Sequence, residues 1–387
     1  MNYSTVYIGM DVHKDTFSLC CYTNEKETAE YPQKVEAHYS KIINYLEAMR
    51  FHYGNDVLFI CGYEAGCLGY SLYHELNAHN VKCVILAPTT MSVPGGRKRI
   101  KTDKRDAAHI ARCLAHHDYS PVNIPTEIDD QVKEYIRMRD DHKLALKKVK
   151  QQILAFCLRH NYQYDGTKTR WTQAHIDWLR KLKVEHLYQE ILEDYLLTYD
   201  YLTQRLKQID ARIEELAASE EYADSVHKLT CFLGISTQTA LSIITETGDF
   251  KRFKDAKHYA AYLGLVPGEN SSGQEQNRLG ITKAGNRHLR MLLVESAQSY
   301  ARGAIGYKSS KIKKRQEGNS PAVIQYADKA NERLRRRYYR LTLSNGKKNN
   351  IAKTAIAREL ACFIWGMMTE NYAGLTASLD KNPSQCC

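Results

Sequence analysis

The stretch Val6-Tyr-Ile-Gly-Met-Asp-Val12 decides the fold, because it is an apolar run with one acidic residue, Asp11, near its end. A second β-rich run, Phe17-Ser-Leu-Cys-Cys-Tyr22, follows a polar turn, so the two runs together predict a β-hairpin. A strand in the middle of such a sheet is buried on both faces, and a carboxylate inside it is costly unless something binds its charge. We therefore expect Asp11 to bind a metal ion.

Outward from this hairpin, residues 1–125 alternate between strand and helix patterns. We expect an edge strand near residues 30–34, helices over 39–50 and 68–78, strands over 57–61 and 81–86, and a helix that opens near Thr102. The order βββαβαβα, with an aspartate in the first strand, is typical of an α/β ribonuclease H-like fold.

Three further carboxylates join Asp11 in this prediction. Glu64 comes a few residues after the apolar strand that ends at Cys61, and Asp103 and Asp106 are three residues apart at the start of a helix over 102–116, which places both on one helical face. Such an oxygen cage suits two Mg²⁺ (or Mn²⁺) ions about 4 Å apart. The cations beside the aspartate pair would balance its charge or reach a phosphate: Lys101, Lys104 and Arg105.

The composition changes at about residue 126. Residues 126–220 show long helical patterns with few breakers, and a regular apolar stripe runs from Leu192 to Leu216. This pattern predicts either a helical hairpin or an intermolecular coiled coil, and an ordinary intramolecular bundle fits it equally well.

Residues 221–387 read as a mainly α-helical domain. Residues 229–244 suggest two helices around a Gly-centred turn, similar to helix-hairpin-helix modules that bind the DNA backbone. Between Lys308 and Lys348 there are 13 Lys or Arg against three acidic residues. Within this part, Arg335-Arg-Arg-Tyr-Tyr-Arg340 combines charge with aromatic surface suited to phosphates and bases. An amphipathic helix over 351–368 follows.

The overall composition agrees with a nucleic-acid partner. The chain has 387 residues, 55 Lys and Arg against 44 Asp and Glu, a net charge of +11 and a sequence pI of about 9.0. Its 11 cysteines form no C-x-x-C pair, which favours a reducing cytoplasm over disulfides or structural zinc. Apolar runs are too short for a membrane span, so no membrane partner is expected.

The motifs resemble those of the insertion sequence 110 transposases, whose relatives include the Piv DNA invertases. Met10-Asp-Val-His-Lys14, Tyr63-Glu-Ala-Gly66 and Lys101-Thr-Asp-Lys-Arg-Asp-Ala107 look like the DEDD motifs of that family. Gly264-Leu-Val-Pro267, Asn270-Ser-Ser-Gly273 and residues 280–290 resemble the signature of its C-terminal domain. The resemblance covers essentially the whole chain.

This resemblance implies an RuvC-like domain over 1–125, a helical coiled-coil linker over 126–220 used in oligomerisation, and a C-terminal transposase domain over 221–387 with a catalytic serine. That serine would be Ser272 rather than Ser271, because it directly precedes Gly273. The implied partners are double-stranded target and donor DNA, a structured noncoding bridge RNA, and copies of the chain itself, as a dimer or as a tetramer in the synaptic complex, in the bacterial cytoplasm at the nucleoid. Further contacts to nucleic acid are expected from Arg278, Lys283, Arg287, Arg335, Arg336, Arg337 and Arg340.

The loop departs from its relatives in one respect. Many of them continue after Ser-Gly with glycine and basic residues, whereas here Gln274-Glu-Gln-Asn277 precedes Arg278.

Several other functions compete with this one. A metal-dependent DNA nuclease or resolvase would need only the carboxylates, and a site-specific invertase would act without a guide RNA. A sugar kinase or actin-like ATPase shares the opening hairpin but requires a second Gly-rich domain. A tyrosine recombinase, with Tyr372 as its nucleophile, would need no carboxylate quartet. A non-catalytic nucleic-acid-binding protein would not need intact carboxylates at all four positions.

Overall fold

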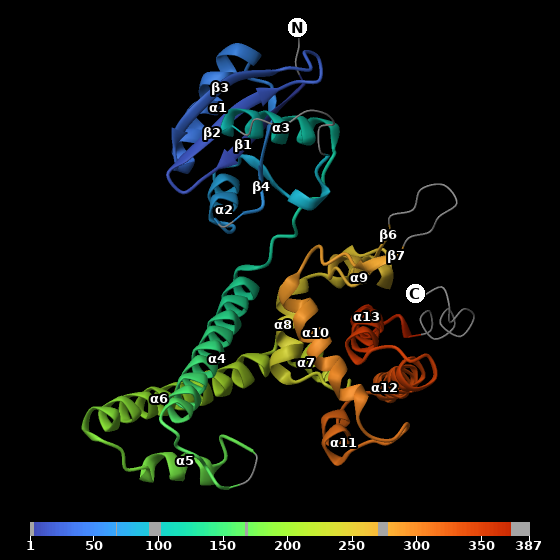
Figure 1. The fold of residues 1–387 in the computed structure, drawn as a ribbon. Helices are drawn as coiled ribbons and strands as arrows, with labels where there is room; N and C mark the ends of the chain where they lie inside the picture. The colour runs from blue at the N-terminus through green and yellow to red at the C-terminus, as the bar shows by residue number, and fades with distance from the viewer. Residues whose placement is uncertain (1–3, 67, 93–101, 167–168, 270–277, 373–387) are drawn as a thin grey trace. The chain divides into compact units, whose positions relative to one another are not determined.

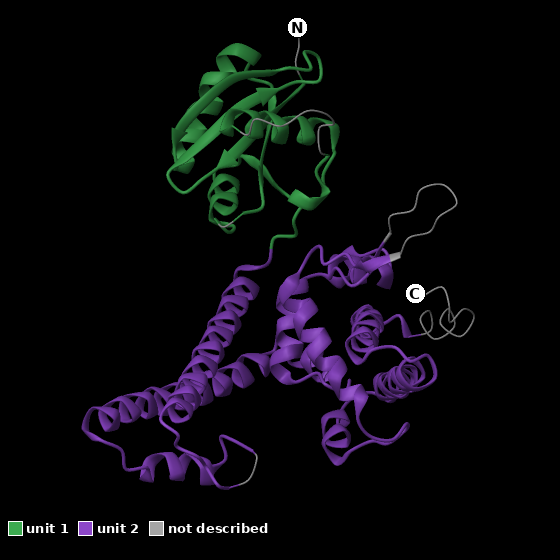
Figure 2. Cartoon of the chain, in the orientation of Figure 1, with its two compact units in different colours: residues 1–124 green, residues 125–387 purple. Residues whose placement is uncertain are grey.

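The chain folds as two compact units, residues 1–124 and 125–387 (Figure 2). The computed structural model describes residues 4–66, 68–92, 102–166, 169–269 and 278–372. The helical middle of the chain lies in the second unit together with the C-terminal part.

The first unit is built on a five-stranded mixed sheet with the order β3-β2-β1-β4-β5 (Figure 1). β1 is antiparallel to β2 and parallel to β4, and β4 is parallel to β5. Every strand and helix expected from the sequence is present: β1 Thr5–Val12, β2 Thr16–Tyr22, β3 Ala29–Glu36, α1 Tyr39–Tyr53, β4 Leu58–Glu64, α2 Ser71–Ala78, β5 Lys82–Leu86 and α3 Asp103–His116, with a short 3-10 turn η1 at Pro88–Thr90.

The two faces of the sheet are covered differently. Alternate residues of β1 and β4, among them Ile8, Met10 and Tyr63, pack with residues of α1 and α2 in one apolar cluster. The opposite face packs against α3, where Cys20 and Tyr22 of β2 contact three alanines of the helix. The period-two alternation of strands therefore assigns Asp11 to the α3 face.

The second unit begins with an arm of two long helices. α4 (Glu127–Arg159) and α6 (His186–Ala217) pack on each other within one chain, and the shorter α5 (Gln173–Lys181) lies in the connection between them (Figure 1). Val149, Ile153 and Leu196 belong to a core of their own in this arm. The pairing within one chain agrees with the predicted helical hairpin.

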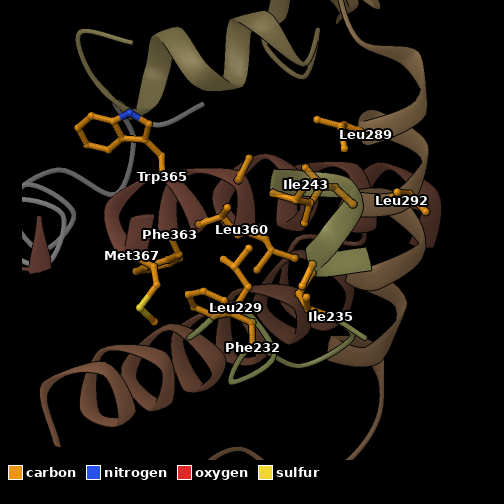
Figure 3. Close-up of a cluster of buried hydrophobic side chains, with 14 of the residues drawn as sticks. Leu229, Phe232, Ile235, Ile243, Leu289, Leu292, Leu360, Phe363, Trp365 and Met367 are labelled. Carbon is orange, nitrogen blue, oxygen red and sulfur yellow. The ribbon is translucent and has the colours of Figure 1, made fainter. Parts of the chain in front are cut away.

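The rest of the second unit is mainly helical. Its core, part of which is shown in Figure 3, joins Phe232 and Ile243 to Leu360 and Phe363, and it also takes in Ile136 and Ile209 from the arm. The arm is thus continuous with the C-terminal core. The elements are α7 Ala223–Leu229, α8 Thr237–Thr247, η2 Phe250–Arg252, α9 Ala256–Tyr262, β6 Pro267–Glu269, β7 Arg278–Ile281, α10 Arg287–Ala297, η3 Gln298–Ala301, α11 Ser310–Gln316, α12 Pro321–Tyr339, η4 Arg340–Ser344 and α13 Asn349–Met368.

Cysteine burial and helix hydropathy complete the description of the fold. Cys61 is fully buried in the core, and burial holds its pKa well above the ordinary thiol value; Cys67 lies outside the described residues. Across the described ranges, no helix combines the length and apolar character that crossing a lipid bilayer requires.

Candidate active site

Two glycines bring α3 close to the sheet. A Cβ atom on Gly9 of β1 would lie 2.0 Å from the carbonyl oxygen of Ala107, and one on Gly62 of β4 would lie 2.7 Å from the side chain of Leu114. The sheet therefore needs glycine at position 9, where a Cβ would meet the helix backbone, whereas at position 62 the leucine side chains would have to shift. Asp103 is one helical turn before Ala107, so this close packing carries it to the end of β1 where Asp11 lies.

Asp11, His13 and Asp103 form a group with metal-ligand geometry. Each offers a ligand atom, and these atoms all lie within 4.8 Å of one another. His13 Nε2 is 3.2 Å from an oxygen of Asp11 and 3.9 Å from an oxygen of Asp103. The structure thus brings together two of the four predicted carboxylates, from the first strand and from the start of α3.

Asp106 lies on α3, which carries Asp103, and Glu64 lies on β4, the strand next to β1, but neither residue belongs to the group. Glu64 is the last residue of β4, one position beyond the parallel pair Met10↔Tyr63, which aligns it with Asp11 on the neighbouring strand. The strand is longer than the predicted 57–61, because β4 continues past Cys61 and Glu64 still pairs with Leu86 of β5. Asp106 is partly buried in the first turn of α3.

His13 was not among the predicted site residues. It follows Asp11 by two positions, so the alternation of a strand that continued into the turn would have placed both side chains on one face. That spacing was the available signal.

Lys34, on the edge strand β3, also contacts this group. Asp11 pairs with Ser18 of β2, and Ser18 pairs with Lys34 of β3, which forms one row across three strands. From the end of this row, Lys34 Nζ donates a hydrogen bond of 3.0 Å to Asp103. This bond, the charge of Lys34 and the nearby imidazole of His13 lower the pKa of Asp103. The sequence alone could not predict Lys34, because its contact depends on the strand register.

The donor set fits a divalent cation. Two carboxylates and one imidazole lie within ligating reach of a common centre, and Glu64 ends the adjacent strand. Carboxylate oxygens are the ligands of Mg²⁺ and Mn²⁺, whereas a set rich in cysteine would favour zinc. The cations Lys104 and Arg105, predicted beside the aspartates, are exposed on α3, and Lys101 lies outside the described residues.

The predicted nucleophiles Ser271 and Ser272, with residues 270–277 as a whole, lie outside the described residues. The chain on either side of them forms the antiparallel pair β6 and β7, of which Arg278 is the first residue of β7. Gly264 and Gly285 sit before and after this pair with positive φ, and a Cβ on either would come within 2.0 Å of a backbone carbonyl oxygen. The chain just before β6 and just after β7 is therefore packed closely.

The second unit contains an ionic network at the start of α10, the helix that follows β7 in the chain. His288, in the first turn of α10, contacts Asp140 of α4 through Nε2 at 3.1 Å and Glu246 of α8 through Nδ1 at 3.2 Å. Glu246 also accepts hydrogen bonds from Asn286, at 2.8 Å, and from Arg137. The sequence prediction missed this cluster, because its members come from three helices far apart in the chain.

Burial and ion pairing oppose each other in this network. Burial would raise the pKa of Glu246, whose side chain is 5% exposed, but the bonds from His288 and Asn286 and the charge of Arg137 lower it to about 2. Hydrogen bonds to Asp140 and Glu246 raise the pKa of His288 to about 9. His288 is therefore held as an imidazolium at neutral pH.

Two of the predicted phosphate contacts are wrong in the structure. Arg335 and Arg337 of α12 are 5% and 8% exposed. Arg335 donates to the carbonyl oxygens of Ala304 and Tyr307, and Arg337 pairs with Glu359 at 3.0 Å. Both guanidinium groups stabilise the interior, because helical periodicity turns alternate faces of the Arg335–Arg340 stretch toward α13 and the 303–307 loop. The exposed side chains among the predicted contacts are Lys283, Arg287, Arg336 and Arg340.

Two helices flank the Gly-centred turn, but the first, α7, ends at Leu229, where the predicted pair begins, and only the second, α8 from Thr237, lies within the predicted stretch. The turn between them contacts other parts of the unit. Leu233 N donates to Asn331, and Arg315 donates to the carbonyl oxygen of Ile235 at 2.9 Å. A Cβ on Gly234 would lie 2.3 Å from the carbonyl oxygen of Ser296. The turn is thus packed against the rest of the unit.

Comparison with known protein families finds two matching models. Residues 8–161 match a transposase model of the DEDD type, and residues 226–311 match the model described as the transposase IS116/IS110/IS902 family. The first match spans Asp11, Glu64, Asp103 and Asp106, and the second spans residues 270–277 and His288.

Full-length relatives give the same result. The protein named y4qE of Sinorhizobium fredii is 32% identical over 370 residues, which are 95% of this chain and 90% of that protein. The transposase for insertion sequence element IS1533 of Leptospira borgpetersenii is 30% identical, over 87% of this chain and 96% of the relative. The pilin gene-inverting protein of Moraxella lacunata is 24% identical over 299 residues, 75% of this chain and 81% of that protein.

Proposed function

This chain belongs to the IS116/IS110/IS902 transposase family, and we propose that it cuts and rejoins DNA with a metal-binding carboxylate site in its first unit and a serine nucleophile in its second. The observation that carries the proposal is the convergence of Asp11 and Asp103 from a strand and a helix that are 92 positions apart in the chain.

We infer that the first unit is an RuvC-like nuclease domain. The sheet order β3-β2-β1-β4-β5 with an aspartate on its central strand supports this fold, as does the match to a DEDD transposase model. The four carboxylates Asp11, Glu64, Asp103 and Asp106 would hold the ions, and His13 would orient Asp11 or serve as a further ligand. Bound Mg²⁺ or Mn²⁺ would stabilise the negative charge that builds up on a phosphate during displacement.

The chemistry proposed for Ser272 conserves phosphodiester bonds. Its hydroxyl oxygen forms an ester with the DNA phosphorus while one bridging P–O bond breaks, and the proton leaves with the departing strand-end oxygen. The reverse exchange rejoins a strand without ATP, because one ester is exchanged for another. The identification of Ser272 rests on the resemblance of Asn270-Ser-Ser-Gly273 to the family's motif, and this stretch lies within residues 226–311, which match the family model.

The proposed partners are target DNA, donor DNA and a structured guide RNA. Support comes from the net charge of +11 and from exposed cations such as Lys283, Arg287, Arg336 and Arg340. The RNA itself is implied by the family resemblance.

A homo-oligomer is also proposed, as a dimer or as a synaptic tetramer. The arm leaves large apolar side chains in contact with solvent, which a second copy would bury. They lie on α4 and α6: Leu144, Leu158, Leu187 and Leu197.

A second candidate is a site-specific invertase that acts without RNA. It is favoured by the similarity to the pilin gene-inverting protein over 81% of that relative's length. The two candidates separate in one experiment: nucleic acid that copurifies with the full chain is extracted and sequenced, and DNA recombination is then assayed before and after digestion with ribonuclease. We expect activity to be lost on digestion and to return when the sequenced RNA is added. Recombination that survives complete digestion would favour the invertase.

A further inference from the structure

Residues 302–316 form a basic segment of the second unit. They contain Arg302, Lys308, Lys311, Lys313, Lys314 and Arg315 and no acidic residue. The segment follows α10 and η3, runs through a loop, and ends with α11 (Ser310–Gln316) (Figure 1). Lys308 to Arg315 belong to the basic stretch 308–348 noted in the sequence, although none of them was named as an individual nucleic-acid contact.

The loop presents two large apolar side chains to solvent. Tyr307 is 65% exposed and Ile305 is 44% exposed. Gly303, two positions before Ile305, and Gly306, directly after it, both have positive φ, a backbone conformation that other residues rarely adopt. The loop is therefore shaped by glycines, and its side chains are left outside the core.

Side chains of α12 hold the backbone of this loop by hydrogen bonds. The buried Arg335 donates through Nη1 to the carbonyl oxygens of Ala304 and Tyr307, and the Tyr339 hydroxyl donates to the carbonyl oxygen of Gly303 at 2.8 Å. Tyr307 N closes a turn to Ala304 O at 3.2 Å. An exposed ring on an anchored backbone loses little conformational freedom on binding, so a contact there is stronger than the same contact on a free loop.

The cations divide into two groups. Lys308 pairs with Asp328, and Arg315 donates to the carbonyl oxygen of Ile235, so these two hold the segment against α12 and the turn before α8. The remaining four side chains lie in solvent: Arg302, Lys311, Lys313 and Lys314. A short stretch of chain thus carries an exposed aromatic ring on an anchored backbone together with four solvated positive charges.

We propose that residues 302–314 bind a nucleic-acid strand at an unpaired nucleotide, with the Tyr307 ring stacked on the base and Lys311, Lys313 and Lys314 facing the neighbouring phosphates. Ile305 adds apolar contact at the edge of the base. Stacking on an aromatic ring recognises unpaired bases in either RNA or DNA, because a base inside a duplex does not offer its face. The proposal deepens the proposed function and rests on its premise that the chain acts on nucleic acid.

An acidic protein partner would also be attracted by the lysines, but the ring argues for a base. A protein contact of useful strength needs an extended apolar patch, whereas this loop offers one aromatic and one aliphatic side chain between charges. A base with flanking phosphates matches both features within the span of one nucleotide and its neighbours.

The test measures binding of the full chain to three labelled probes: a fully paired duplex, the same duplex with one unpaired 2-aminopurine nucleotide in a DNA strand, and its RNA counterpart. We expect Tyr307→Ala to weaken binding to the bulged probes by about 5- to 150-fold, since stacking contributes about 1–3 kcal/mol per base, and to change duplex binding less than about twofold. Tyr307→Trp should retain the affinity and the quenching of 2-aminopurine fluorescence. The DNA and RNA arms show which strand supplies the nucleotide.

Two controls make the result specific. Phe51→Ala removes an aromatic side chain that is 90% exposed on α1 and should leave all three affinities unchanged. Lys311→Gln with Lys313→Gln and Lys314→Gln should weaken binding to every probe and reduce the salt dependence, as loss of phosphate contacts does. Equal affinity of Tyr307→Ala and wild type for the bulged probes, or no quenching in the wild type, would overturn the proposal. A chain that binds no nucleic acid at all would instead overturn the proposed function.

Discussion

His288 Nδ1 lies 3.2 Å from a carboxylate oxygen of Glu246, a residue 42 positions earlier in the chain. The contact joins the first turn of α10 to α8, and through Asp140 and Arg137 it also reaches α4. The network therefore lies at the start of α10, the helix that follows β7 in the chain.

The network predicts a stability that depends on pH. The raised pKa of His288, about 9, stabilises the folded state fully below the ordinary histidine pKa of about 6.5, and this contribution is lost as the pH rises through 9. The lowered pKa of Glu246, about 2, stabilises above its ordinary value of about 4.3 and is lost as the pH falls through 2. We expect the network's contribution to the free energy of unfolding to be greatest between about pH 4.5 and 6.5.

The corresponding variant is His288→Gln. It should lower the free energy of unfolding by about 2–4 kcal/mol at pH 6 and by less at pH 9.5, because a buried carboxylate loses a charged partner only where His288 is protonated. Denaturant unfolding at both pH values measures the difference. His258→Gln, which removes an exposed histidine paired with Asp255, is the control and should cost less than about 1 kcal/mol. An equal loss for His288→Gln at both pH values would show that packing, not charge, accounts for the contact.

The second prediction concerns Gly9. Because its Cβ position lies 2.0 Å from the carbonyl oxygen of Ala107, Gly9→Ala should force α3 away from the sheet and lower the free energy of unfolding by about 3 kcal/mol or more. The carboxylates of α3 move with the helix, so Mn²⁺ affinity should fall as well. Gly66→Ala is the matched control, since the nearest atom to its Cβ position is 3.9 Å away. Similar unfolding curves for the two variants would contradict the proposed role of Gly9.

The third prediction concerns the nucleophile. A suicide substrate that traps the cleaved strand should yield a covalent protein–DNA adduct in the wild type and none in Ser272→Ala. Ser271→Ala is the control and should still form the adduct. Peptide mapping locates the linked residue: an adduct on Tyr372, or wild-type recombination by Ser272→Ala, would exclude Ser272, while an adduct on Ser271 would keep the chemistry and correct the residue.

Local patterns were sufficient to predict most of the fold. The alternation in β1, β2 and β4 and the apolar faces of α1 and α13 predicted these elements, because each depends on residues a few positions apart. Asp11 stood out for the same reason, as a charge inside an apolar strand.

Contacts between distant segments could not be predicted from the sequence. Lys34 reaches Asp103 only through the register of β1, β2 and β3, and His288 meets Glu246 and Asp140 only when three helices pack. The errors at Arg335 and Arg337 have the same origin. A run of arginines alone predicts a solvated surface, but here Glu359 of α13 pairs with Arg337, and carbonyl oxygens of the 303–307 loop accept hydrogen bonds from Arg335. Tyr307 could not be singled out from the sequence, because its exposure is known only from the structure.

The central claim, that Asp11 helps to hold a catalytic divalent cation, is tested most directly by strand cleavage in Asp11→Asn, measured together with Mn²⁺ binding. Asp15→Asn removes the same charge from the exposed hairpin turn and serves as the matched control. We expect Asp11→Asn to lose cleavage by at least about 100-fold and to bind Mn²⁺ more weakly, because a ligand charge is gone, while it retains its affinity for nucleic acid. Cleavage and Mn²⁺ affinity equal to those of Asp15→Asn would contradict the account.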